Sequence, residues 1–161
     1  MNQLFGLQFF IKRKNLKIAI IGAGAAGIMA AITAKRLNKN LQIDLFDANK
    51  SIGKKILASG NGRCNISNSN ITSKNYIGEN PDFINYALKE FDFKAFEKFC
   101  KSIGLLLDIK ESGKVYPLSN EAKSVTNLLE LALQELDVRD FLETFINDIE
   151  KEGEKFIIRT N

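Results

Sequence analysis

The sequence predicts an α/β fold built on a parallel sheet, and three observations lead to that prediction. A short apolar run, Lys17 to Ile21, is followed by glycines and by an alanine-rich helical stretch, Ala25 to Leu37. A second apolar run, Gln42 to Phe46, comes next. A third, Val138 to Thr144, follows another long helical pattern. Strands that alternate with helices form βαβ units, and right-handed crossovers then give the strand order 3-2-1.

The first strand and the turn after it have the strongest pattern. The strand is apolar and β-branched, which predicts burial on both faces of the sheet. Gly22, Gly24 and Gly27 then have G-x-G-x-x-G spacing between a strand and a helix. Gly22 allows a tight turn, Gly24 lets the backbone approach a pyrophosphate, and Gly27 lets the helix pack closely on the strand. The first N–H groups of the helix, at Ala25 and Ala26, are expected to face the phosphates.

An acidic residue follows the second strand. Asp47 stands about 20 positions after Gly27, where a carboxylate accepts hydrogen bonds from the ribose of an adenosine. A Gly/Ala-rich helix entry that binds nothing is the alternative interpretation of the glycines. Because strand, helix and acid all stand where such a site needs them, the sequence predicts a Rossmann-like, three-layer fold that binds a dinucleotide.

The middle of the chain predicts a loop and two helices. Residues 49–77 are rich in Gly, Ser, Asn and Lys, which favours a long functional loop. Asn80-Pro81-Asp82 has the capping residues of a helix that carries Phe83 to Phe91. A second helix runs from Asp92 to Gly104. We expect the phenylalanines of both helices to form a packed face rather than a surface that stacks on a ligand.

Two hairpins and one helix complete the prediction. The first hairpin spans 105–116, with Gly113 at the positive-φ position. Ser119 or Asn120 is expected to cap a helix that runs to Leu136. The last hairpin pairs 145–149 with 155–160.

The composition restricts the chemistry. The chain has 161 residues, of which 45% are hydrophobic and 26% charged, as in soluble globular proteins. It has no histidine, which excludes a Ser-His-Asp triad and a His-ligated zinc site within this chain. Cys64 and Cys100 are 36 positions apart, which argues against a dithiol pair or an iron–sulfur site and suits the reducing cytoplasm. Cys100 is expected to be a buried small hydrophobe, and no metal site is predicted.

The net charge and the N-terminal residues give weaker indications of function. The net charge of +4 comes from scattered lysines and does not by itself indicate nucleic acid. Residues 1–14 contain an apolar patch that is too short to span a bilayer and lacks the charge order of a secretory signal. We expect an N-terminal extension there, and no membrane partner.

A second motif lies in the loop after the second strand, which reads SIGKKILASGNGRCNISN from Ser51 to Asn68. A third, GKVYP, covers Gly113 to Pro117 before a capped helix. With the first glycine turn, these stretches resemble the bacterial BaiN/RdsA-type NAD(P)/FAD-dependent oxidoreductases. The matching residues of the loop are Gly53, Lys55, Ser59, Gly60, Gly62, Arg63, Cys64 and Asn65. Family members usually have glutamate where this chain has the shorter Asp47.

The resemblance implies FAD as the cofactor and NAD(P)H as the electron donor. It also implies reduction of an unsaturated bond, in a steroid-like small molecule or in the uridine of ribosomal RNA. The expected cofactor-binding residues are Gly22, Gly24, Ala25, Ala26, Gly27, Asp47, Lys55, Ser59, Gly60, Gly62, Arg63, Cys64 and Asn65.

The chemistry of the loop from Ser51 to Asn68 agrees with these cofactor-binding assignments. Backbone N–H groups from Ser59 to Gly62 suit the far side of a pyrophosphate, whose charge Arg63 or Lys55 would neutralise. Lys54 is expected to be solvated. For Cys64 a catalytic role beside the flavin, with a thiolate favoured by Arg63, and a structural role both remain open.

Members of the family are about two and a half times as long as this chain. We therefore expect residues 15–161 to be the N-terminal part of an FAD-binding Rossmann domain, with an insertion at about 78–118 and a missing C-terminal remainder. Two alternatives remain. One is an NAD-dependent dehydrogenase, which Asp47 would suit, and the other is a dinucleotide-binding fragment without activity of its own.

Overall fold

The computed structural model describes residues 16–80 and 82–161, so the predicted extension at 1–14 and the capping Pro81 lie outside the described residues. The α/β class is confirmed. Three parallel strands form the central sheet, and their order β1-β2-β6 is the predicted 3-2-1 arrangement. These strands are β1 (Lys17–Ile21), β2 (Gln42–Phe46) and β6 (Arg139–Phe141).

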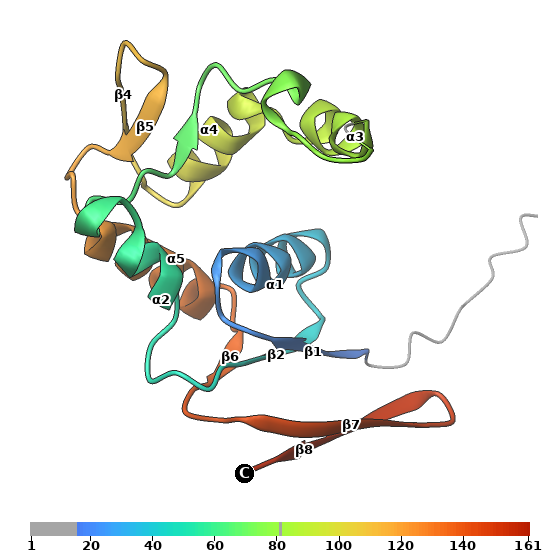
Figure 1. Ribbon diagram of the computed structural model, residues 1–161. Helices are drawn as coiled ribbons and strands as arrows, with labels where there is room; N and C mark the ends of the chain where they lie inside the picture. The colour runs from blue at the N-terminus through green and yellow to red at the C-terminus, as the bar shows by residue number, and fades with distance from the viewer. Residues whose placement is uncertain (1–15, 81) are drawn as a thin grey trace, which may run out of the picture.

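Two helices cover one face of this sheet. Figure 1 shows α1 (Ala25–Leu37) and α5 (Ala122–Glu135) on the same side of the three strands, and the two helices contact each other. The core lies between them and the sheet, because the helical and strand patterns point their apolar side chains at the same space. Its buried members include Ile28, Ile32, Ile43, Leu45, Leu129 and Leu133.

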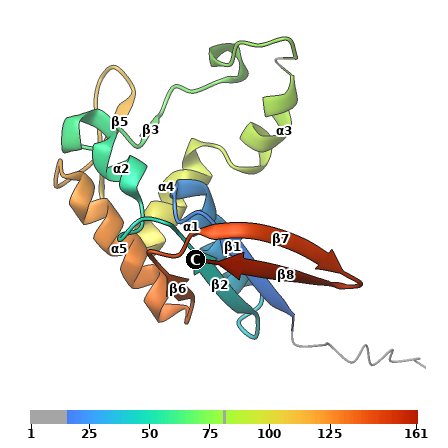
Figure 2. The same cartoon turned by 60° about the horizontal axis from the view of Figure 1, so that its bottom comes forward.

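The expected burial of β1 on both faces is wrong. Ile18 and Ile20 pack against the core, whereas Lys17, Ala19 and Ile21 are exposed, Ile21 by 50%. The reason lies in what covers each face. Figures 1 and 2 place the hairpin of β7 (Ile146–Glu152) and β8 (Lys155–Thr160) on the side of the sheet opposite to α1 and α5, where it leaves Ile21 accessible.

The predicted loop at 49–77 is more regular than expected, since it contains α2 (Lys54–Ala58), the 3₁₀ turns η1 (Ser59–Gly62) and η2 (Ser73–Asn75), and β3 (Ser67–Asn68). The two helices and the hairpin predicted after it are present as α3 (Phe83–Glu90), α4 (Phe93–Ser102), β4 (Leu107–Ile109) and β5 (Lys114–Pro117). A second sheet has the order β3-β5-β4. Sequence periodicity missed α2 and β3 because each is very short and contacts a distant element, α5 for α2 and β5 for β3.

Two further details differ from the predictions. The phenylalanine face is confirmed on α4, where Phe96 and Phe99 pack against the core, but on α3 Phe83 is 64% exposed. The N-cap position of α5 is Glu121, not Ser119 or Asn120, and its side chain makes no capping hydrogen bond. The Ser119 hydroxyl instead pairs with that of Ser124, and Asn120 adopts a positive φ of 56°. Within 16–80 and 82–161, no helix has the length and apolarity needed to cross a bilayer.

Candidate dinucleotide site

The first glycine bend joins β1 to α1 and has the geometry that its spacing predicts. Gly22 has a φ of 102°, and its N–H donates to Phe46 O over 2.7 Å. A Cβ on Gly27 would lie 1.9 Å from Gly22 O, so only glycine allows this contact between helix and turn. A Cβ on Gly24 would meet nothing within 4 Å. The backbone at Gly24 is therefore open to a ligand.

Helix α1 presents its positive end at this bend. Its first intrahelical bond runs from Ile28 N–H to Gly24 O, over 3.0 Å. The N–H groups that precede it, at Ala25, Ala26 and Gly27, have no intrahelical acceptor. Together with the helix dipole they form an environment that favours an anion such as a diphosphate.

Asp47 lies beside the bend and is held by three hydrogen bonds. Its Oδ2 accepts the Ala23 N–H over 2.7 Å. Its Oδ1 accepts the backbone N–H of Asn49 at 2.8 Å and the side-chain Nδ2 of Asn49 at 2.7 Å. Partial burial alone would raise the pKa of Asp47, but these bonds and the charge of Lys54 outweigh burial and lower the pKa below its ordinary value of 3.8. The carboxylate is ionised at neutral pH.

The second bend is hydrogen-bonded to the first where it begins. The N–H of Gly53 donates to Ala23 O over 2.7 Å, which ties the start of α2 to the turn after β1. Gly60, Asn61 and Gly62 then have positive φ angles of 56°, 54° and 80°. The Cys64 N–H donates back to Ser59 O at 3.1 Å, so the chain reverses within a few residues.

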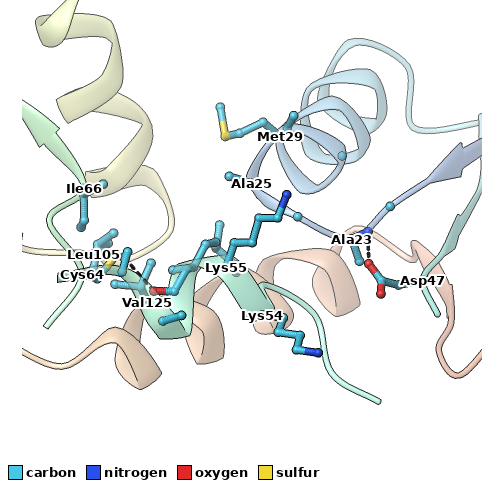
Figure 3. Close-up of a pocket in the computed structure, with 18 of the residues that line it drawn as sticks. Ala23, Ala25, Met29, Asp47, Lys54, Lys55, Cys64, Ile66, Leu105 and Val125 are labelled. Carbon is cyan, nitrogen blue, oxygen red and sulfur yellow. Dashed lines mark hydrogen bonds between the residues drawn. The ribbon is translucent and has the colours of Figure 1, made fainter. Parts of the chain in front are cut away.

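The first bend lines a cavity of about 1110 Å³, together with Ser59, Cys64 and Asn65, which flank residues 60–62 of the second bend. This volume is at or above the upper end of the roughly 300–1,000 Å³ that ligand pockets usually have. Figure 3 shows Ala23, Ala25 and Asp47 on one side of it, Cys64, Ile66 and Leu105 on the other, and Lys55 reaching between them. Ten of the predicted site residues line this cavity: Gly22, Gly24, Ala25, Ala26, Gly27, Asp47, Lys55, Ser59, Cys64 and Asn65.

Three predicted residues, Gly60, Gly62 and Arg63, are not brought to the cavity. The guanidinium of Arg63 lies over the ring of Tyr116, 5.6 Å from its centroid, and its Nε donates to Gly60 O at 3.4 Å. Arg63 therefore joins the second bend to β5. Cys64, which is only 4% exposed, is buried at the cavity wall.

The cavity also contains residues that the sequence did not single out. Asn49 contacts Asp47, and Lys54, expected to be solvated, lines the cavity and donates to Asn49 Oδ1 over 2.9 Å. An amide two positions after a carboxylate is a common local pairing, and that spacing was the available signal. The apolar part of the wall comes from α4, α5 and neighbouring segments, and includes Phe96, Phe99, Ile103, Leu105, Val125 and Leu129.

Cys100 lies in the same apolar wall. Its predicted burial is confirmed, and burial raises the pKa of its thiol to about 12. This thiol is protonated at neutral pH and acts as a small hydrophobic group.

An adenine dinucleotide fits these residues. The open backbone at Gly24, the N–H groups at the start of α1 and the Lys55 ammonium suit a diphosphate, and the ionised Asp47 suits a ribose hydroxyl. The first glycine bend, Asp47 and the residues flanking the second bend therefore meet at one cavity, whereas Gly60 and Gly62 lie outside it.

Known proteins resemble the chain over most of its length. It is 38% identical over 145 residues to the 3-dehydro-bile acid delta(4,6)-reductase of Clostridium scindens, a match that covers 90% of this chain and 35% of that protein. It is 30% identical over 146 residues to the ribosomal RNA dihydrouridine synthase of Haemophilus influenzae, with 88% and 36% covered. The chain thus spans about a third of the length of these relatives.

Solved structures share the fold at lower identity. An Escherichia coli quinol fumarate reductase matches with a TM-score of 0.60 and 18% identity, over 86% of this chain and 28% of that one. The p-nitrophenol 4-monooxygenase of Pseudomonas putida matches with a TM-score of 0.52 and 12% identity, over 89% and 36%. The model of the HI0933-like protein Rossmann domain matches residues 16–161, and the chain therefore belongs to that family, as its motifs predicted.

Proposed function

We propose that this chain is the FAD-binding part of a flavin-dependent oxidoreductase that reduces an unsaturated bond with NAD(P)H as the electron donor. The observation that carries the proposal is the cavity lined by the first glycine bend, by Asp47 and by the residues that flank the second bend. The names of the two curated relatives, a bile acid reductase and a dihydrouridine synthase, both describe the saturation of a double bond.

The residues of the cavity have separate roles in this proposal. The N–H groups of Ala25 and Ala26 hold the diphosphate, Lys55 offsets its charge, and Asp47 accepts a ribose hydroxyl. When bound, the flavin supplies the hydride transfer, while the protein supplies position and electrostatics. The long second bend supports FAD over a nicotinamide dinucleotide, because a nicotinamide site needs only the first bend and the acid.

The second bend would form the wall toward the flavin. With its amide nitrogen facing Val115 O at 3.2 Å and Ser67 O at 3.1 Å, Asn65 keeps its side-chain oxygen as an acceptor for the cofactor. We propose Ser59 and Cys64 as further contacts on this side. Contacts from Gly60, Gly62 and Arg63 stay predictions, and they would require Arg63 to leave Tyr116.

Cys64 is also our candidate for a redox or acid role beside the flavin. Its buried position at the cavity wall supports closeness to the cofactor, but its proposed partner Arg63 contacts Tyr116 and Gly60 instead. The dependence of its alkylation rate on pH tests the role. An unshifted, slow thiol would remove it.

The substrate class follows from the relatives alone. A steroid-like molecule with a conjugated double bond and a uridine in ribosomal RNA are the two candidates. We expect the 161 residues alone to bind cofactor without turnover, because they span a third of the relatives' length. Oxidation of NADPH by this chain, stimulated by either substrate, would contradict that expectation.

Titration of the full chain with FAD, followed by flavin fluorescence, tests the cofactor. We expect saturable binding that Gly24→Val weakens at least about tenfold, because the new side chain occupies the space of the diphosphate. Gly78→Val is the matched control, since a Cβ there also meets nothing within 4 Å and Gly78 lies outside the cavity. Binding of NAD with no binding of FAD would favour the dehydrogenase alternative, and binding of neither would reject a dinucleotide site.

A further inference from the structure

The carboxylate of Asp47 is held in place by Asn49. Oδ1 accepts two bonds from that residue, at 2.8 Å from the backbone and 2.7 Å from the side chain. Oδ2 accepts a single bond, from the Ala23 N–H. A carboxylate offers about four acceptor sites, two on each oxygen. The free site is therefore on Oδ2, the oxygen nearer the first glycine bend.

Asn49 is itself fixed on both sides. Its side-chain Oδ1 accepts Lys54 Nζ over 2.9 Å, from the first turn of α2. Its backbone carbonyl accepts the N–H of Glu143 at 3.0 Å, and Asp47 O accepts the N–H of Thr144 at 3.0 Å. A side chain with its backbone and both ends of its amide engaged has little rotational freedom. It can therefore hold the group that it contacts in one orientation.

We infer that Asn49 is a positioning residue, anchored by Lys54, which turns Asp47 so that Oδ2 accepts one hydroxyl of an adenosine ribose. The inference rests on the proposed function, because it assumes an adenine nucleotide in this cavity. It adds that recognition of the ribose depends on a residue that need not touch the nucleotide. Without the Asn49 side chain, only the backbone N–H at that position still holds Oδ1, so the carboxylate is less restricted and its second oxygen competes for the Ala23 N–H.

The test compares ADP with 2′-deoxy-ADP and 3′-deoxy-ADP by calorimetry on the full chain. We expect the wild-type chain to bind ADP at least about tenfold more tightly than one of the deoxy analogues, because a hydrogen bond to a charged group is lost. Asn49→Ala should reduce this ratio to about twofold or less, and Lys54→Met should reduce it partly. Asn127→Ala, an exposed amide on α5, should leave the ratio unchanged.

The pH dependence of ADP binding is a second measurement. It would not change if Asn49 had only a structural role. Lys54 of α2 is the charged group that lowers the pKa of Asp47. Lys55 lines the same cavity, Glu143 donates its backbone N–H to Asn49 O, and Arg139 and Asp140 lie on the neighbouring strand β6. Asn49→Asp removes the side-chain donor and places a second negative charge beside Asp47, and both changes raise the pKa of Asp47, although the backbone N–H groups at positions 23 and 49 still donate to it. As the pH falls, ADP binding by Asn49→Asp should therefore weaken at a higher pH than binding by the wild-type chain. This variant also covers the case in which Asn49→Ala fails to fold.

The outcomes separate the two proposals. If the wild-type chain binds ADP and distinguishes a deoxy analogue, but Asn49→Ala distinguishes it equally well, the positioning role is overturned and the cofactor proposal stands. If the wild-type chain binds ADP without any preference, Asp47 does not recognise the ribose and the inference fails. If neither ADP nor FAD binds, the proposed function itself fails.

Discussion

The two glycine bends beside the cavity need glycine for different reasons. In the first bend the requirement is space, since a Cβ on Gly27 would lie 1.9 Å from Gly22 O. In the second the main requirement is backbone conformation, since consecutive residues adopt positive φ and non-glycine residues also do so, at Asn61 and Cys64. A position limited by space, such as Gly27, admits no side chain unless the helix moves, whereas a position limited by φ alone, such as that of Asn61, admits one at a moderate cost in free energy.

The two bends also differ in how they are joined to the rest of the fold. The first bend is joined to β2 by the bond from Gly22 N–H to Phe46 O, so it is part of the sheet. The second is joined to the first through Gly53 and to β5 through Arg63 and Tyr116. We expect the first wall to be rigid and the second to tolerate substitution.

The largest expected effect is at Gly27. Gly27→Ala should lower the free energy of unfolding by about 3 kcal/mol, because helix α1 must move away from Gly22. This loss exceeds the roughly 1 kcal/mol of helix propensity that alanine gains. Gly24→Ala is the matched change in the same bend and should cost less than about 1 kcal/mol. Urea denaturation measures both, and equal losses would contradict a limit set by space.

The next effect is at Gly60 in the second bend. Gly60→Ala should lower the free energy of unfolding by about 2 kcal/mol. Its φ is 56°, and its Cβ would lie 2.8 Å from the Asn65 backbone nitrogen. Asn61→Gly, at a φ of 54°, should instead be neutral or slightly stabilising. A loss on Asn61→Gly would show that its side chain, and not its backbone conformation, matters.

Asp47 joins the two walls, and its contribution to stability depends on pH. Asp47→Asn should lower the free energy of unfolding by about 1.5 kcal/mol at neutral pH, because three donors lose a charged acceptor. The pKa of Asp47 is lower in the folded chain than its ordinary value of 3.8. Its contribution is therefore complete above pH 3.8 and lost as the pH falls through the folded value.

Denaturation as a function of pH measures this contribution. The difference between the wild-type chain and Asp47→Asn should shrink only in acid. The exposed Asp140→Asn should show little difference at any pH. A constant difference from pH 7 to pH 2 would contradict the linkage.

The smallest effect concerns the two cysteines of the cavity. Since the pKa of Cys100 is raised to about 12, roughly one thiol in ten thousand is ionised at pH 8. Iodoacetamide should therefore modify Cys64 and spare Cys100, and bound FAD should slow the reaction several-fold. Peptide mass mapping identifies the modified residue. Modification of Cys100 before Cys64 would contradict this accessibility.

Local signals predicted the boundaries of the first βαβ unit, although not the exposure of one face of β1. The strands at 17–21 and 42–46 and the helix at 25–37 have the expected boundaries, because glycine spacing and helix propensity act within a few residues. The cap of α5 was missed because two candidates, Ser119 and Asn120, stood before the same helix. The Ser119–Ser124 pairing and the positive φ of Asn120 excluded both.

The residues of the candidate site also divide into those that the sequence predicted correctly and those that it did not. Asp47, Gly22 and Gly24 were predictable, because the chemistry of a dinucleotide requires those residue types at that spacing. Arg63 was expected at the cofactor, but packing against Tyr116, a residue 53 positions later in the chain, holds it away from the cavity.

The order of the strands, the first glycine bend and the acid that accompanies it follow from the sequence, since each depends on neighbours along the chain. The contact of the second bend with the first, and the hold of Asn49 and Lys54 on Asp47, are visible only in the folded chain. The same holds for the apolar wall that α4 and α5 complete. Those arrangements depend on contacts between segments far apart in sequence, and local propensity carries no information about them.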